Sequence, residues 1–77
     1  CTGSVVLSLP AARVRPFAGD GRVEAVPGGT MLTLGAWSWM ALAAAFARFD
    51  AAMGDVHPRE LREAFASLAT RAATAAR

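Results

Sequence analysis

Cysteine and histidine are almost absent from this chain of 77 residues. Cys1 is the only cysteine, so no disulfide can form within the chain. His57 is the only histidine, and the remaining side chains predict no zinc site around it. A chain this short makes at most one domain and is marginally stable on its own. We therefore expect residues 1–77 to form a single small domain or a fragment, stabilised by another protein chain, copies of itself, a membrane or a longer parent chain.

Lysine is also absent, and all eight basic residues are arginines. The arginines are spread along the chain among six acidic residues, and the net charge is only +2. Domains that bind nucleic acid usually gather their basic residues on one face or one helix. The distribution of charge therefore does not favour nucleic acid as a partner.

Motifs for catalysis or for small ligands are missing too. The glycines of GDG (19–21) and PGG (27–29) lack the lysine that follows in a phosphate-binding loop, and turns explain them. Glu60 and Glu63 alternate with arginines, which indicates a salt-bridged, solvent-exposed helix face. His57 lies in a predicted loop. A histidine there more often caps a helix or is solvated than acts as a general base. The sequence predicts no catalytic residue, cofactor, metal site or small-molecule substrate.

The first 34 residues have the pattern of an antiparallel β meander. Short β-branched or alternating runs predict strands, and they are SVVLSL (4–9), ARVRPF (12–17), RVEAV (22–26) and TMLTL (30–34). AGDG at 18–21 predicts the loop of a hairpin between the second and third runs. PGG at 27–29 predicts a second turn. Three or four strands are therefore expected over about residues 4–34.

After Gly35 the spacing of large apolar residues changes to the pattern of amphipathic helices. One stripe consists of Trp39, Leu42, Phe46, Phe49 and Met53, and a second consists of Leu61, Phe65, Leu68, Ala72 and Ala75. Between them, Gly54 is expected to end one helix and Pro58 to begin the next, with Asp55 or His57 as its cap. The predicted fold class is α+β, a small β meander followed by a two-helix antiparallel hairpin over about residues 36–76.

Residues 30–49 contain no charge before Arg48, so a membrane span has to be considered. Thr30, Thr33 and Gly35 interrupt the front of the segment, and its tryptophans would lie near the bilayer centre, away from the headgroups that they prefer. The apolar stripe also continues beyond Arg48. A strand followed by a water-exposed amphipathic helix is the preferred interpretation. A membrane span formed by residues 31–47 and a segment lying in the membrane interface are the alternatives.

The first four residues, CTGS, leave three interpretations open. They resemble the start of a mature bacterial lipoprotein, which implies acylation of Cys1 and a membrane-associated small subunit. Cys1 could instead be the nucleophile of an N-terminal-cysteine hydrolase fragment, although such chemistry needs an oxyanion hole and a cleft. It could also be an ordinary thiol at an arbitrary boundary.

Both predicted helices are rich in alanine, which favours helix formation but buries little area. The larger side chains are therefore expected to form most of the core, namely Trp39, Leu42, Phe46, Phe49, Leu61, Phe65 and Leu68. Phe17, Trp37 and Met40 either complete this core or extend an apolar surface toward a partner chain. The predicted function is a non-enzymatic structural or protein-interaction module, a subunit or a piece of a larger assembly. The sequence indicates no compartment.

Overall fold

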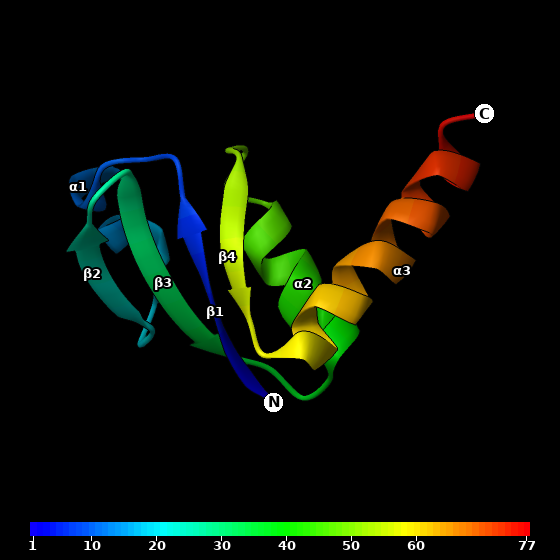
Figure 1. Ribbon diagram of the computed structural model, residues 1–77, viewed down its shortest axis with the longest axis horizontal. Helices are drawn as coiled ribbons and strands as arrows, with labels where there is room; N and C mark the ends of the chain where they lie inside the picture. The colour runs from blue at the N-terminus through cyan, green and yellow to red at the C-terminus, as the bar shows by residue number, and fades with distance from the viewer.

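The computed structural model describes residues 1–77 as a four-stranded antiparallel sheet with three helices (Figure 1). This confirms the α+β class. In chain order the elements are β1 (Thr2–Leu7), α1 (Ala11–Val14), the 3₁₀ turn η1 (Arg15–Phe17), β2 (Arg22–Val26), β3 (Gly29–Gly35), α2 (Trp39–Ala47), β4 (Met53–His57) and α3 (Arg59–Ala75).

The strand order is β2-β3-β1-β4, with every neighbouring pair antiparallel. The connection from β1 through α1 to β2 therefore joins two parallel strands that have β3 between them. The connection from β3 through α2 to β4 likewise joins two parallel strands on either side of β1. The sheet is thus built from two interleaved split β-α-β units and not from a simple meander.

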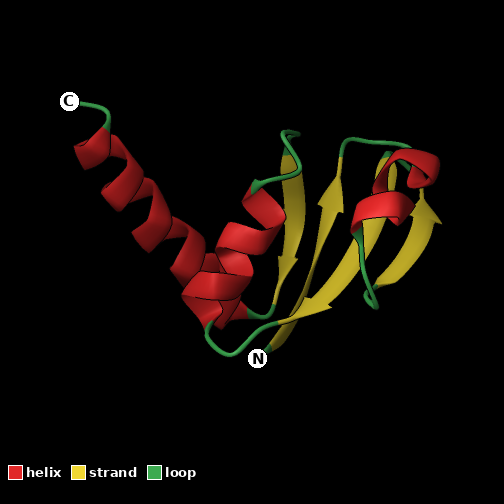
Figure 2. Ribbon diagram, turned by 180° about the vertical axis from the view of Figure 1, so that it is seen from behind, coloured by secondary structure: helices red, strands yellow, loops and turns green.

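Alternation along β1 and β3 determines which side chains enter the core. Val5 pairs with Leu32, and both are fully buried on the face that α1 and α2 cover. Ser4 pairs with Thr33 on the opposite face, which no helix covers (Figure 2). The three helices supply the rest of the core, including Val14, Leu42, Phe46 and Leu61, all fully buried.

The turn between β2 and β3 confirms the prediction from PGG. Val26 pairs with Gly29, so Pro27 and Gly28 form the tip of a hairpin. Gly28 has φ +88°, a conformation that side chains with a Cβ rarely adopt. The strands predicted at 4–9, 22–26 and 30–34 correspond to β1, β2 and β3.

The strand predicted at 12–17 is wrong, because this segment forms α1 and η1. Val14 and Ala18 are both buried, and their separation of four residues is that of one helical turn. Pro16 also lacks the N–H that a strand would need for its ladder. The hairpin with a loop at 18–21 is therefore absent, and the segment crosses from β1 to β2 as a helix.

The predicted helical hairpin is interrupted, because residues 53–57 form β4 and not a loop. α2 ends at Ala47, so Phe49 and Met53 lie beyond it, and Gly54 lies in a strand. β4 pairs with the side of β1 that β3 leaves free. Neither Asp55 nor His57 caps α3, which follows Pro58 without a side-chain cap. The two helices do contact each other. They are not antiparallel as predicted, because β4 runs between them and both helices start at the same end of the sheet (Figure 1).

Residues 31–47 do not form one continuous helix. They comprise most of β3, a short loop and α2, whose N-terminus is capped by the Ser38 hydroxyl, which accepts from the Ala41 N–H at 3.0 Å. No helix in the structure combines the length and the apolar character that a membrane crossing requires. The alternative of a spanning helix at residues 31–47 is therefore wrong.

Candidate interaction surface

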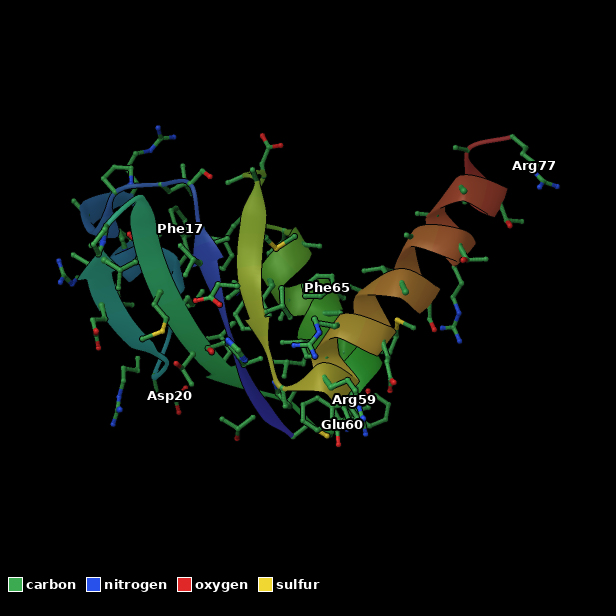
Figure 3. The ribbon with its side chains drawn as sticks, in the orientation of Figure 1. Phe17, Asp20, Arg59, Glu60, Phe65 and Arg77 are labelled. Carbon is green, nitrogen blue, oxygen red and sulfur yellow. The ribbon has the colours of Figure 1, made fainter.

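A shallow apolar groove lies between β4 and α3. Met53, Val56, Arg62 and Phe65 line a volume of about 260 Å³ there. Figure 3 places Phe65 in the angle where α3 leaves the body of the chain. The groove exists because Leu61 and Ala64 are buried against the body of the chain, which fixes the start of α3 beside the sheet edge. Further along, α3 diverges from β4.

The second half of α3 extends away from the rest of the chain (Figure 1). Every residue from Ala69 to Arg77 is exposed. A helix of 17 residues is about 25 Å long, at about 1.5 Å per residue. Roughly half of that length has no tertiary packing, although such packing normally supplies most of a helix's stability.

An apolar stripe continues from the groove along this free part of α3. Phe65 lies in the groove, and Ala69, Ala72 and Ala76 follow it at spacings of four, three and four residues. This spacing puts them on the same side of the helix as Phe65. Alanine side chains are small, so another chain can approach the helix backbone closely along this stripe.

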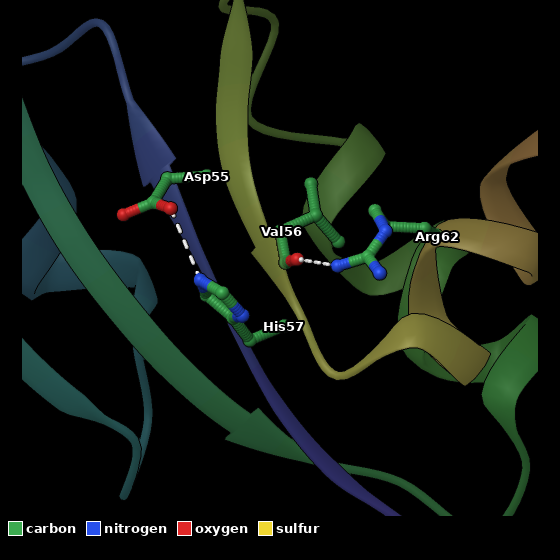
Figure 4. Close-up of polar contacts among 4 residues, drawn as sticks. All are labelled: Asp55, Val56, His57 and Arg62. Carbon is green, nitrogen blue, oxygen red and sulfur yellow. Dashed lines mark hydrogen bonds and ion pairs between the residues drawn. The ribbon is translucent and has the colours of Figure 1, made fainter.

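The outer edge of β4 is partly blocked by an arginine. The guanidinium of Arg62 donates a hydrogen bond from Nη1 to the Val56 carbonyl at 2.9 Å, on the side away from β1 (Figure 4). Unpaired carbonyl groups at a sheet edge attract further strands, and a charged side chain is a common protection against this. Arg62 therefore both lines the groove and occupies the edge.

Positive charge predominates along α3. Residues 59–77 contain four arginines and two glutamates, and Glu63 is the last acidic side chain. Glu63 forms a loose exposed pair with Arg59, at 3.9 Å. Arg71 and Arg77 form no salt bridge. The charged side chains of residues 69–77 are thus both positive, Arg71 and Arg77.

The three apolar residues predicted for an interface do not form one patch. Trp37 is 89% exposed just before α2, with half-buried Met40 in the first turn of that helix. Phe17 is 65% exposed, and its carbonyl accepts a hydrogen bond from Arg48, just after the end of α2. Phe17 and Trp37 are thus at opposite ends of a nine-residue helix. A role for each in binding stays a prediction.

Cys1 is exposed at the end of the sheet. Its amino group donates to the Ala36 carbonyl at 2.9 Å, and the Ala36 N–H donates to the Cys1 carbonyl at 2.9 Å. These bonds extend the pairing of β1 with β3 by one step. Acylation of the thiol and a nucleophilic role for it stay predictions.

The remaining polar candidates lie on the surface. His57 and Asp55 form an exposed pair, with 3.0 Å between Nε2 and Oδ1, at the edge of the uncovered sheet face (Figure 4). The first turns of α3 carry Glu60 and Glu63, both exposed to solvent. None of these four side chains lines the groove.

No family model, curated protein or solved structure matches the chain. The role of the groove is therefore inferred from its geometry and chemistry. The sequence pattern does not reveal the groove, because Met53 continues the predicted helical stripe and Val56 lies between the two predicted helices. The alternation of Asp55, Val56 and His57 indicates a strand, but Gly54 followed by Asp55 resembles a turn.

Proposed function

We propose that this chain is a non-enzymatic protein-interaction module that binds a partner along the groove and the free part of α3. The observation that supports this is the run of nine exposed residues, Ala69–Arg77, that continues an apolar groove. A helix end that does not pack against the rest of the chain contributes little to the stability of the fold. A partner seated there would cover Phe65 and Met53, which the chain itself leaves partly in water.

The small size of the core supports the same proposal. Ten hydrophobic residues are buried, and three of them are alanines. At about 0.05–0.15 kcal/mol per residue, a chain of 77 residues is expected to have a free energy of unfolding of roughly 4–12 kcal/mol. We expect this chain at the low end of that range, where additional burial against a partner has a large effect on stability.

A chain shortened to end at Leu68 tests the proposal. If Ala69–Arg77 serves binding and not folding, the shortened chain keeps its free energy of unfolding within about 1 kcal/mol of the full chain, because every residue removed is exposed. Urea denaturation followed by circular dichroism measures this difference. Amide hydrogen exchange on the full chain should find residues 69–77 far less protected than β1 and α2.

Two results would contradict the proposal. A loss of more than about 2 kcal/mol on shortening would make the segment part of the fold. A free energy of unfolding above about 12 kcal/mol for the full chain alone would remove the need for a partner.

A further inference from the structure

We propose that two copies of this chain pair through the outer edges of their β2 strands, so that the two sheets join into one. The strands run antiparallel, with a two-fold axis at Val23. This inference goes beyond the proposed function, because it uses the edge of the sheet opposite to the groove and to α3.

The outer edge of β2 is open. β2 is the last strand of the sheet on the side away from β4, and its ladder with β3 runs without a bulge from Arg22 to Val26. Both views show α1 over one face of the sheet and nothing of the chain beyond the outer edge of β2 (Figures 1 and 2). The strand contains no proline, and no side chain bonds to its backbone. Another strand can add to such an edge.

The backbone groups of Val23 and Ala25 point out of the sheet. Cys1 and Ala36 exchange both of their backbone hydrogen bonds, and this pairing continues in register along β1 and β3. Even-numbered residues of β3 therefore bond to β1 and odd-numbered ones to β2, because bonding alternates between the two sides of a strand. The odd-numbered residues of β3 lie opposite the even-numbered residues of β2. Val23 and Ala25 thus offer their N–H and C=O groups to a further strand.

The charges on β2 are complementary between two copies. With the axis at Val23, each Arg22 lies opposite the partner's Glu24 in a non-hydrogen-bonded pair, where facing side chains are closest. Both side chains are exposed on the uncovered face, and neither forms a salt bridge within its own chain. The two Val23 residues exchange backbone bonds at the axis. Their half-buried side chains meet on the face that bears the core.

The neighbouring registers fit less well. An axis at Glu24 would place the two Glu24 carboxylates opposite each other, and an axis at Arg22 would do the same to the two guanidinium groups. An axis at Ala25 would place Val23 opposite the partner's Pro27, which has no N–H to donate. A second copy therefore meets the requirements of this edge in one register, as a two-fold contact must.

The pairing also stops at two copies. At the other edge of the sheet, Arg62 bonds to the Val56 carbonyl, and the ladder of β4 shifts register between Ser4 and Val6. The joined sheet thus ends in a protected strand on both sides. Five residues per copy make a small contact, under about 1,200 Å² in total. We therefore expect a weak dimer, with a dissociation constant on the order of 100 μM.

Sedimentation equilibrium of the full chain at low ionic strength, between about 10 μM and 1 mM, tests the proposal. Glu24→Arg leaves only arginines at the facing positions, and Arg22→Glu leaves only glutamates. Each variant should self-associate at least about tenfold more weakly, because the two-fold axis turns two attractions into two repulsions. An equimolar mixture of the two variants should associate again within about threefold of the original affinity, because every arginine then faces a glutamate.

Nuclear magnetic resonance tests the register without a substitution. In a mixture of ¹³C-labelled and unlabelled chains, an isotope-filtered Overhauser effect should connect the Hα of Arg22 to the Hα of the partner's Glu24, because facing Hα atoms are close in a non-hydrogen-bonded pair. Dilution should remove this signal and the protection of the Val23 and Ala25 amides from hydrogen exchange.

The matched controls lie on α3, at the other end of the sheet. Glu63→Arg and Arg71→Glu make the same changes in net charge at exposed positions. Both should leave the association constant unchanged within about twofold, because they are far from β2. The chain ending at Leu68 should also dimerise like the full chain, since it retains β2.

Several outcomes would overturn the proposal. These are a chain that stays monomeric at about 1 mM, charge-reversed variants that associate like the original, or a mixture that does not recover. Loss of the dimer on shortening to Leu68 would assign self-association to α3 instead. The unfolding free energy of the shortened chain judges the proposed function separately, because β2 is intact in it.

Discussion

Replacing Gly3 by alanine should destabilise the fold, because Gly3 lies where β1 meets three other elements. A Cβ added at this buried glycine would be 2.7 Å from the His57 carbonyl oxygen, 2.9 Å from Leu61 Cδ2 and 3.3 Å from Leu42 Cδ2. The first of these atoms is backbone of β4, which cannot move without disturbing its pairing with β1. The leucines come from α3 and α2.

The size of the effect follows from two opposing contributions. Inserting a methyl group into a packed core typically costs about 1–3 kcal/mol. The reduced freedom of the unfolded chain on changing glycine to alanine returns about 0.4–1 kcal/mol. A net loss of about 1–2 kcal/mol remains. For a domain of this size, the midpoint of thermal unfolding should then fall by about 10 °C.

Gly54→Ala is the matched control. Gly54 also lies in a strand, but a Cβ added there meets no heavy atom within 4 Å, and its φ is not positive. Thermal and urea unfolding of the two variants, followed by circular dichroism, gives the comparison. We expect Gly54→Ala to match or slightly exceed the stability of the original chain. Equal stability of the Gly3→Ala and Gly54→Ala variants would refute the close approach of α2, α3 and β4 to β1.

Other substitutions test the core, the predicted interface residue and the sheet edge. Phe46→Ala should cost about 3–5 kcal/mol in urea denaturation, since Phe46 is fully buried, and a loss below about 1 kcal/mol would argue against its central position. Trp37→Ala should change the free energy of unfolding by less than about 0.5 kcal/mol, because its side chain is 89% exposed, and a larger loss would return Trp37 to the core. Arg62→Ala should lower stability by about 0.5–1.5 kcal/mol and increase association in light scattering, because it frees the Val56 carbonyl at the edge. Arg59→Ala, which removes only a loose pair with Glu63, should do neither.

Local patterns in the sequence predicted the elements that form by themselves or between neighbours. The β-branched run at β1, the turn at Pro27 and Gly28, and the start of α2 close to Trp39 all agree with the structure. Leu42, Phe46 and Leu61 were predicted as core residues and are fully buried. In these cases the spacing of apolar residues matches the period of one element.

The errors arose where a distant partner decides the local structure. The segment 12–17 alternates like a strand over a few residues, but burial of Val14 and Ala18 on one side requires a helical turn. MGDVH is a weak strand sequence, and it becomes β4 because β1 presents a free edge to it. The groove depends on both β4 and the divergence of α3, so its residues could not be grouped from sequence spacing alone.

The central position of β1 also dictates when the chain can fold during synthesis. Of the four strands, β1 is synthesised first, yet one neighbour begins at Gly29 and the other is completed only at His57. Ser4 and His57, paired across the ladder, are 53 positions apart. Pairing between strands so far apart in the sequence slows folding, and it leaves the apolar face of β1 exposed until its neighbours have been synthesised.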